Sequence, residues 1–453
     1  MLRVAVIGSG PSGCYTAQSL VQSDPGVRVD VLDRLPCPYG LVRYGVAPDH
    51  EKIKSLQVSL RGVLEHERVR FLGGVRVGGP GGLPVERLRE LYHAVVYCVG
   101  AATDRRLGVP GEDLPGSWSA TEFVSWYSAH PDAADSGFLR GVRSAVVIGV
   151  GNVAVDVTRM LVRGAAELRP TDIPQAALDT LTASGIDEVH MVGRRGPAQA
   201  RFTTKELREL GALPGIDVRV DPGELALDPV DPATLPPAQR RNVEVLRGWA
   251  AAPQAPAGRR IDLRFFLRPV ALLPEAPGTG PEPGGERVGA VRFERTVPDE
   301  HGGVTGTGRF EDVPAQLVLR SVGYRGVALD GLPFDASTGT VPHVAGRVVR
   351  DGVPSPGEYV AGWIKRGPTG VIGTNRPCAK ETALSLLADA ATLARADVPA
   401  DPVAALRAGG IDPVPWSGWL SIERAEAALG ADLGRSVVKL ADWDTLLGAA
   451  RTP

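Results

Sequence analysis

Residues 2–13 read LRVAVIGSGPSG, and residues 145–154 read AVVIGVGNVA. Each stretch is a short apolar run followed by small residues in the spacing Gly-x-Gly-x-x-Gly or Gly-x-Gly-x-x-Ala. A buried strand that turns through such a loop into a helix is the dinucleotide-binding fingerprint of a Rossmann fold. Two copies in one chain predict two nucleotides in one molecule, as in enzymes that pass electrons between a flavin and a nicotinamide.

The first loop is followed, one strand later, by an acidic residue. Its candidate nucleotide-binding residues are Gly8, Gly10, Pro11, Ser12 and Gly13. Glycine allows the tight turn and the close approach of backbone to phosphate, and the helix N-terminus points N–H groups at the pyrophosphate. The next strand, predicted over Val27–Leu32, ends at Asp33, 20 residues after Gly13. An acid there accepts a hydrogen bond from a ribose hydroxyl and repels a 2′-phosphate. The alternative is a purely structural glycine turn.

The second loop is followed by two arginines instead of an acid. Its candidate residues are Gly149, Gly151, Asn152 and Val153, at the start of a helix predicted over Val153–Val162. A strand predicted over Glu188–Val192 then leads to Arg194 and Arg195. Paired guanidinium groups suit a phosphate because they offer fixed charge and fork-shaped donors. The second loop is therefore predicted to prefer NADP(H) to NAD(H), with a solvated surface pair as the alternative.

Composition limits the class of protein. The chain has 453 residues, of which 43% are hydrophobic, enough for two or three domains with proper cores. Its net charge of −2 argues against a general attraction to nucleic acid. The chain starts directly with a strand and has no apolar run long enough to span a membrane, so we expect a cytoplasmic protein.

Cysteine and histidine usage argues against several kinds of site. The four cysteines, Cys14, Cys37, Cys98 and Cys378, are far apart and form no C-x-x-C motif. A redox dithiol and a protein-borne iron–sulfur cluster therefore both lack ligands. No His/Asp/Glu spacing indicates a metal site, so we expect none.

The order of the segments predicts an inserted domain. Residues 1–103 contain the first loop and end in an apolar strand over 94–101, whose small end at Gly100 is expected to return the chain to the nucleotide. Residues 104–322 contain the second loop, include a hairpin expected within 274–309, and end in a similar strand over 317–324. The rest of the chain, 323–453, predicts a strand over 359–363, a helix over 380–395 and a short helical cap in the last forty residues. We expect an α/β protein of two doubly wound, Rossmann-like domains, with 104–322 inserted between 1–103 and 323–453.

Four segments carry a pattern that is specific because of its order. They are Pro38–His50, Gly149–Asp156, Gly193–Pro197 and Gly362–Asn375. Together they resemble the adrenodoxin-reductase-like ferredoxin–NADP⁺ reductases, and the likeness runs from residue 1 to about 385. Phe202–Leu210 is similar to the bacterial, actinobacterial-type branch of that family. Asp33 departs from the pattern, because the family more usually has Glu at the ribose position.

The resemblance implies that the first domain, 1–103 with 323–453, binds FAD and that 104–322 binds NADPH. On the flavin side it implies that the following residues contact the cofactor, with Val75 near the adenine: Leu41, Val46, Val75, Trp363, Gly370, Val371 and Ile372. On the other side it implies pyrophosphate contacts from Asn152 and Val153 and a 2′-phosphate grip by Arg194 and Arg195. Glu206 would lie near that phosphate, and Arg105 would reach in from the domain junction.

The resemblance also suggests catalytic candidates. His50 and Glu209 look like the family's pair beside the nicotinamide, which could orient the ring or relay a proton, and Trp363 would lie beside the isoalloxazine. Alternatively, His50 is a satisfied structural histidine and Trp363 a core aromatic. The implied reaction moves a hydride from NADPH to FAD and then single electrons to a ferredoxin, which in turn would serve a haem-thiolate monooxygenase.

A basic region could dock an acidic ferredoxin on this otherwise acidic chain. It spans Arg240 to Arg268 and consists of Arg240, Arg241, Arg247, Arg259, Arg260, Arg264 and Arg268. A solvated face that keeps the domain soluble is the alternative.

Two rival functions stay open. One is the flavin and NADPH electron-transfer subunit of a larger, glutamate-synthase-like complex, whose members carry a cysteine-rich N-terminal segment that is not found here. The other is a non-enzymatic nucleotide-sensing scaffold, which predicts NADPH binding without flavin.

Overall fold

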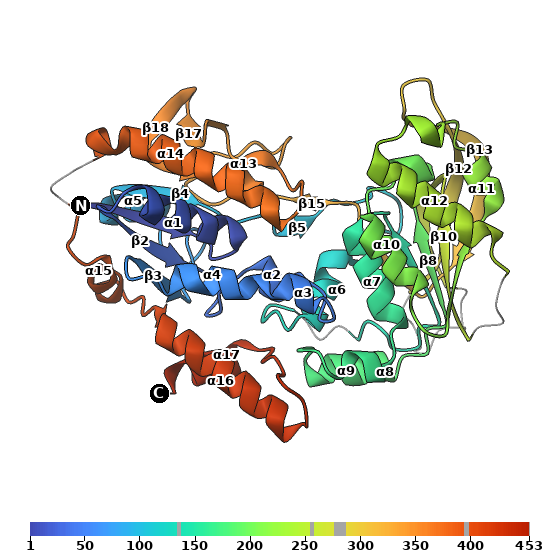
Figure 1. The fold of residues 1–453 in the computed structure, drawn as a ribbon, viewed down its shortest axis with the longest axis horizontal. Coiled ribbons are helices and arrows are strands. Elements are labelled where there is room, and N and C mark those ends of the chain that lie inside the picture. Colours follow the sequence, from blue (N-terminus) through green and yellow to red (C-terminus); the bar gives the residue numbers. More distant parts are fainter. Residues whose placement is uncertain (134–136, 254–257, 276–286, 394–397, 453) are drawn as a thin grey trace. The chain divides into compact units, whose positions relative to one another are not determined.

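The computed structural model describes residues 1–133, 137–253, 258–275, 287–393 and 398–452, which belong to two compact units (Figure 1). Unit 1 consists of Met1–Thr103, Ser128–Asp132 and Gly323–Pro453, and unit 2 of Asp104–Tyr127 and Ala133–Val322. Unit 2 is thus an insertion in the chain of unit 1. Ser128–Asp132 lies inside the range expected for the inserted domain but packs with unit 1, where Trp443 Nε1 donates to Asp132 Oδ1 (2.8 Å).

Unit 1 is built on an eight-stranded sheet in the order β16-β17-β18-β4-β1-β2-β3-β19. The five strands from β18 to β3 are parallel, and the strands at both edges are antiparallel. Short β15 pairs with β5, which lies where the chain leaves the unit. The strands are β1 (Leu2–Ile7), β2 (Val27–Leu32), β3 (Val69–Gly73), β4 (Ala94–Tyr97), β5 (Thr103–Asp104), β15 (Tyr324–Arg325), β16 (His343–Val344), β17 (Arg347–Arg350), β18 (Val353–Val360) and β19 (Val414–Pro415).

Apolar cores lie on both faces of this sheet because its central strands are buried almost throughout. On one face α1 and α14 pack against each other, and α4, α16 and α17 add to the same core. On the other face α5 and α15 cover the sheet. The helices of unit 1 are α1 (Pro11–Ser23), α2 (Leu41–Tyr44), α3 (Glu51–Lys54), α4 (Leu56–Leu64), α5 (Val85–Leu91), α13 (Trp363–Arg366), η3 (Ile372–Thr374), α14 (Asn375–Leu393), α15 (Pro402–Ala408), α16 (Trp416–Asp432) and α17 (Trp443–Arg451).

Unit 2 is built on a six-stranded sheet in the order β6-β14-β7-β8-β10-β9, in which every pair is parallel. A separate antiparallel sheet, β11-β12-β13, packs its apolar side on one face of the parallel strands. The strands are β6 (Ser117–Ser119), β7 (Ser144–Ile148), β8 (Glu188–Val192), β9 (Ile216–Val220), β10 (Arg259–Arg264), β11 (Leu267–Pro274), β12 (Val288–Pro298), β13 (Val304–Pro314) and β14 (Leu317–Arg320).

The opposite face of the unit 2 sheet is covered by helices, which form the largest core of that unit. The helices are α6 (Ala120–Tyr127), α7 (Asn152–Val162), α8 (Ala165–Leu168), α9 (Gln175–Thr182), η1 (Pro197–Gln199), α10 (Thr204–Gly211), α11 (Pro222–Ala226), η2 (Pro232–Thr234) and α12 (Pro237–Ala251). Both units are therefore Rossmann-like α/β layers, as the two loops predicted.

Several predicted elements have different bounds in the structure. The strands predicted over 94–101 and 317–324 end at Tyr97 and Arg320. The strand predicted over 359–363 ends at Val360, because Gly362 has φ +80° and Trp363 already begins α13. The predicted helix 380–395 begins earlier, at Asn375, and its last two residues lie outside the described part of the chain. The hairpin expected within 274–309 is formed by β12 and β13, and residues 276–286 are likewise not described.

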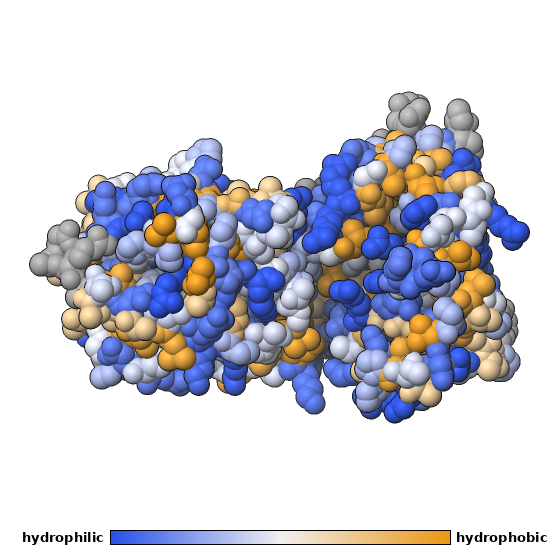
Figure 2. Space-filling model, turned by 90° about the horizontal axis from the view of Figure 1, so that it is seen from above, coloured by the Kyte–Doolittle hydropathy of each residue, from blue (hydrophilic) through white to orange (hydrophobic). Residues whose placement is uncertain are grey.

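On the face seen in Figure 2, hydrophobic residues form small patches separated by hydrophilic ones. The large apolar side chains with most exposure, such as Val58, Val353 and Val371, come from different elements, which is normal for a protein surface. Among the described residues, no helix is both long enough and apolar enough to cross a membrane.

Candidate functional sites

The first glycine loop forms a tight turn between β1 and α1 in unit 1. Gly8 has φ +107°, and a Cβ there would lie 2.6 Å from the Cys98 carbonyl oxygen. A Cβ on Gly13 would lie 1.8 Å from the Gly8 carbonyl oxygen, so only glycine lets the helix approach the strand this closely. The helix accepts its first hydrogen bond at Gly10 from Cys14 N (3.0 Å), which leaves the N–H groups of Ser12 and Gly13 without helical acceptors. Pro11 has no N–H at this position. This helix start suits an anion.

Two further glycines from distant segments lie against this loop. A Cβ on Gly40 would come within 3.0 Å of Gly10 Cα, and one on Gly362 within 2.4 Å of Ser12 Oγ. Both glycines have positive φ values, +50° and +80°. Three segments therefore meet closely around the start of α1 because each has a glycine there, and this cradle fits the pyrophosphate of a dinucleotide.

Asp33, predicted to bind a ribose, is held mainly by the loop itself. Its Oδ2 accepts hydrogen bonds from Ser9 N (2.8 Å) and Ser9 Oγ (2.5 Å), and its Oδ1 accepts one from Leu35 N (2.9 Å). Burial raises the pKa of Asp33, and these hydrogen bonds oppose that shift. A carboxylate accepts about four hydrogen bonds, so Oδ1 keeps capacity for one more donor. The ribose contact stays a prediction, now with a second role for Asp33 in fixing Ser9.

Val75 lies just beyond this carboxylate and is almost fully buried in the core. Its N–H donates to the Asp33 carbonyl oxygen (2.8 Å) and so already has an acceptor, and its contact with an adenine stays a prediction. An open depression of about 440 Å³ lies on the surface next to this segment. It is lined by Arg34, Arg76, Val77, Gly78, Gly79, Asp132, Ala328, Leu329 and Asp330.

The residues predicted to line the flavin differ in accessibility. Leu41 is exposed, Val46 is half-buried, and Gly100 has φ +74° with no atom near its Cβ position. Trp363 is half-buried outside the hydrophobic cores and packs on Tyr324, with ring centroids 5.3 Å apart. Its position does not match the core-aromatic alternative.

The segment after Trp363 is a turn with limited freedom. Gly370 has φ +82°, and Val371, which is exposed, donates its N–H to Thr374 Oγ1 (3.0 Å). Ile372 begins η3, and its carbonyl oxygen accepts a hydrogen bond from Asn375 Nδ2 (3.0 Å). The predicted backbone contacts of these residues with the flavin stay predictions.

His50 is buried in unit 1, at the N-cap of α3. Its N–H donates to the Ala47 carbonyl oxygen (3.0 Å), and its carbonyl oxygen accepts from Ile53 N and Lys54 N. The backbone of His50 therefore closes the turn after Pro48-Asp49.

The second glycine loop repeats the geometry of the first in unit 2. Gly149 has φ +138°, and a Cβ there would lie 2.2 Å from the Ser321 carbonyl oxygen. Gly151 has open space around its Cβ position, at the N-cap of α7. Asn152 Oδ1 accepts from Thr203 N (2.7 Å), and Val153 packs against the core. The helix start is thus open and presents N–H groups that fit a second phosphate.

Three arginines gather near this loop. Arg194 is exposed and Arg195 half-buried after β8, and Arg201 donates its N–H to the Val150 carbonyl oxygen (2.9 Å). Burial lowers the pKa of Arg195, and the charges of Arg194 and Arg201 lower it further. Within the described residues none of the three guanidinium groups forms an ion pair. Their mutual repulsion favours an anion, and Arg201 is a third member that the sequence interpretation missed.

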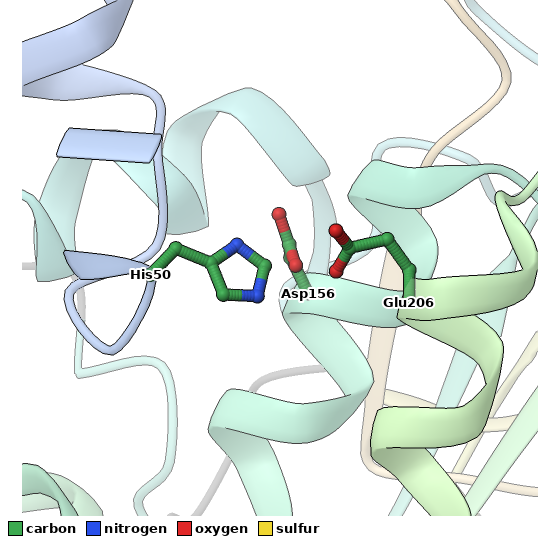
Figure 3. A group of neighbouring side chains, drawn as sticks. All are labelled: His50, Asp156 and Glu206. Carbon is green, nitrogen blue, oxygen red and sulfur yellow. The ribbon is translucent and has the colours of Figure 1, made fainter. Parts of the chain in front are cut away.

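Glu206 and Glu209 lie on α10 around a fully buried arginine of α7. Arg159 Nη2 is 3.0 Å from Asp156 Oδ1, and its Nη1 is 3.6 Å from Glu206 Oε2 and 3.3 Å from Glu209 Oε2. Figure 3 shows the carboxylates of Asp156 and Glu206 directed toward one another; His50, also drawn there, belongs to unit 1. One buried cation thus contacts three carboxylates, and the i, i+3 spacing of Asp156 and Arg159 is the sequence signal for one of these three contacts.

The structure shows the exposure of Arg105 and reduces the number of arginines available in the basic region. Arg105 is exposed. Four of the seven arginines of the basic region have internal partners: Arg259 binds the Val162 carbonyl oxygen, and Arg260, Arg264 and Arg268 form ion pairs. Arg240, Arg241 and Arg247 on α12 are exposed and form no ion pair with any described residue. The basic surface is therefore smaller than predicted.

One group in unit 2 has the geometry to hold a metal ion. Glu188, His190 and Asp262 offer ligand atoms within 4.8 Å of one another. Arg260 already forms ion pairs with both carboxylates, so each has a cationic partner without a metal ion, and we assign no metal there.

Comparison with known proteins agrees with this architecture. Residues 2–212 match the family described as pyridine nucleotide-disulphide oxidoreductase. NADPH-ferredoxin reductase FprA of Mycobacterium tuberculosis is 45% identical over 469 residues, covering 98% of each chain. The mitochondrial NADPH:adrenodoxin oxidoreductase of Arabidopsis thaliana is 40% identical over 468 residues, covering 99% of this chain and 95% of that protein.

A solved structure has the same fold. Mycobacterium tuberculosis FprA in complex with NADPH matches with a TM-score of 0.90 and 44% sequence identity, covering 100% of both chains. Because these relatives match over nearly their whole length, the chain belongs to the family of NADPH–ferredoxin reductases of the adrenodoxin-reductase type.

Proposed function

We propose that this chain is an NADPH-dependent ferredoxin reductase that holds FAD in unit 1 and NADPH in unit 2. The observation that carries this proposal is the difference between the two strand ends. β2 is followed by a half-buried carboxylate, Asp33, whereas β8 is followed by Arg194 and Arg195 without acidic partners among the described residues. A ribose hydroxyl suits the first and a 2′-phosphate the second.

The reaction joins a two-electron donor to a one-electron acceptor. Bound FAD would supply that conversion, because a nicotinamide gives up a hydride and an iron–sulfur ferredoxin accepts one electron. The protein's part is to hold both nucleotides, align their rings and keep water away. Ser12 and Gly13 would hold one pyrophosphate and Asn152 and Val153 the other, each from a helix start.

The roles proposed for residues beside the flavin and nicotinamide rings rest on the family resemblance. We assign Trp363, Leu41 and Val46 to the flavin, and His50 and Glu209 to the nicotinamide. Arg159 would orient Glu209 through their 3.3 Å contact. Downstream of the ferredoxin, a haem-thiolate monooxygenase is the proposed consumer.

The two rival functions are weaker. The relatives named as reductases match over nearly the whole of both chains, which favours a reductase over a subunit of a glutamate-synthase-like complex. A sensing scaffold that binds only NADPH has no need for a second nucleotide cradle in unit 1 in addition to the arginine site in unit 2.

The purified protein should be yellow, and anaerobic NADPH should bleach the visible flavin band, because the proposed reaction reduces FAD before any acceptor is present. The measurement is an anaerobic absorbance titration, followed by addition of oxidised ferredoxin, which should restore the band. A colourless protein that binds NADPH would instead support the sensing scaffold.

Replacing Arg194 and Arg195 together by alanine should raise the NADPH KM about ten- to a hundredfold, because charged hydrogen bonds to the 2′-phosphate are lost. The NADH KM should change little, since NADH has no such phosphate. Arg208→Ala, an exposed arginine on α10, is the matched control and should leave both constants unchanged. Equal losses for NADPH and NADH would show that the arginine pair is structural.

We further propose that ferredoxin docks at Arg240, Arg241 and Arg247. Arg240 and Arg247 are about two turns apart and so lie on one side of α12. Reversing the charge of Arg240 and Arg241 to glutamate should lower the rate of ferredoxin reduction about tenfold at low salt, with a smaller effect at high salt. Reduction of a small dye should be unaffected.

Arg309→Glu, another exposed arginine of unit 2, serves as the control for that experiment. If the double variant reduced ferredoxin and dye as fast as the wild type, α12 would not be the docking surface.

A further inference from the structure

The backbone that approaches the first glycine loop from the side is unusual. Tyr39 has φ +81°, a conformation that a non-glycine residue rarely adopts, and Gly40 follows with φ +50°. Tyr39 N donates to the Ser9 carbonyl oxygen (3.1 Å), which ties this turn directly to the loop. Such a conformation persists only where the surroundings hold it in place.

The surroundings are supplied by the C-terminal segment, whose role the sequence did not reveal. Trp419 of α16 is buried and packs edge-on against the Tyr39 ring, with centroids 5.9 Å apart. Two turns along the same helix, Glu426 accepts hydrogen bonds from Arg43 at both carboxylate oxygens, at 3.1 and 2.5 Å. Arg43 belongs to α2, the turn that carries Leu41.

Both members of this ion pair are removed from water, since their side chains are only 5% and 3% exposed. The guanidinium carbon of Arg43 lies 5.0 Å from the Tyr44 ring centre and 4.9 Å from that of Trp419. Burial disfavours the charge of Arg43, yet Glu426 raises its pKa well above the usual value. A buried pair of this kind is costly to break, because the remaining charge is left without a partner.

A lysine from the same C-terminal segment holds the backbone of the turn. Lys439, also buried, donates from Nζ to the carbonyl oxygens of Arg43 (2.7 Å) and Ser128 (3.3 Å). The stretch around Lys439 is itself anchored on Glu426, whose Oε1 accepts from Leu440 N (2.9 Å). Glu426 therefore binds the side chain of Arg43 in α2, and Lys439 binds the main chain of the same residue.

We propose that Glu426 and Lys439 are positioning residues for the flavin site, acting through the Tyr39–Tyr44 turn. The turn presents Leu41 on its accessible side and Gly40 against Gly10. A displacement of α2 would therefore move the apolar contact assigned to the flavin and the backbone beside the pyrophosphate together. This inference rests on the proposed function in so far as unit 1 holds FAD.

The competing explanation is that the C-terminal segment only stabilises the fold. Both explanations predict a lower melting temperature when the contact is broken. Only the positioning role predicts weaker FAD binding and a changed flavin environment in protein that is still folded.

Glu426→Gln keeps the shape of the side chain but removes its charge, and Lys439→Met removes the donor but keeps the apolar stem. In each variant the dissociation constant of FAD, measured by the fluorescence of released flavin, should rise about tenfold or more. The visible spectrum of bound flavin should also shift, while far-UV circular dichroism and the affinity of unit 2 for 2′,5′-ADP stay at wild-type values.

Glu423→Gln is the matched control, because Glu423 lies on the same helix and pairs with Arg61 (3.0 Å) instead of Arg43. It should bind FAD as the wild type does. If Glu426→Gln does not fold, Glu426→Asp together with Lys439→Met carries the test.

Wild-type FAD affinity and spectrum in folded Glu426→Gln and Lys439→Met would overturn the positioning role, even with lower melting temperatures. An equal loss in Glu423→Gln would also overturn it, because the effect would then not depend on the Arg43–Glu426 ion pair. A wild-type protein that binds no FAD would be a different result, since it would refute the proposed function itself.

Discussion

The first glycine of each loop lies so close to the neighbouring strand's end that no side chain fits there. A Cβ on Gly8 would meet the carbonyl oxygen of Cys98, just after β4, and a Cβ on Gly149 that of Ser321, just after β14. Both loops must therefore pass the carboxyl edge of their sheets directly beside the end of the adjacent parallel strand. The helix that follows is then directed with its free N–H groups toward the edge where nucleotides bind.

The two units share this loop geometry and differ in the few residues that surround the predicted ribose. In unit 1, Asp33 fastens the loop through Ser9 and keeps limited capacity for a ribose hydroxyl. In unit 2, the corresponding region carries three arginines, and burial together with the charges of Arg194 and Arg201 lowers the pKa of Arg195. The same loop geometry can thus hold an unphosphorylated ribose in one unit and a phosphorylated one in the other.

The parts of this molecule that could be predicted are those whose cause is local in the sequence. A strand, a glycine turn, a helix and the residues after the next strand follow one another in a single stretch of chain, from Leu2 to Asp33 in unit 1 and from Ser144 to Arg195 in unit 2, so their pattern shows directly. Strand ends were less predictable, because the apolar stretches after Tyr97 and Arg320 continue in sequence while pairing stops. The basic region shrank because partners from other elements, such as Glu224 and Glu311 for Arg264, were invisible in the local pattern.

Contacts between distant segments could not be predicted at all. Arg43 and Glu426 are 383 positions apart, and neither residue type alone indicates a buried pair. Tyr39 likewise gives no sequence signal of a positive φ, since that conformation is imposed by Trp419 and Ser9 from outside the turn. The contacts of the C-terminal segment with the Tyr39–Tyr44 turn therefore become visible only in the folded structure.

The central claim is that the residues after β2 and β8 make two similar loops hold different nucleotides. A crystal structure of the protein with FAD and NADP⁺ bound tests this most directly. We predict the adenosine ribose of FAD beside Asp33 and the 2′-phosphate of NADP⁺ in contact with Arg194 and Arg195. A 2′-phosphate bound away from both arginines, or FAD bound at the second loop, would contradict the account.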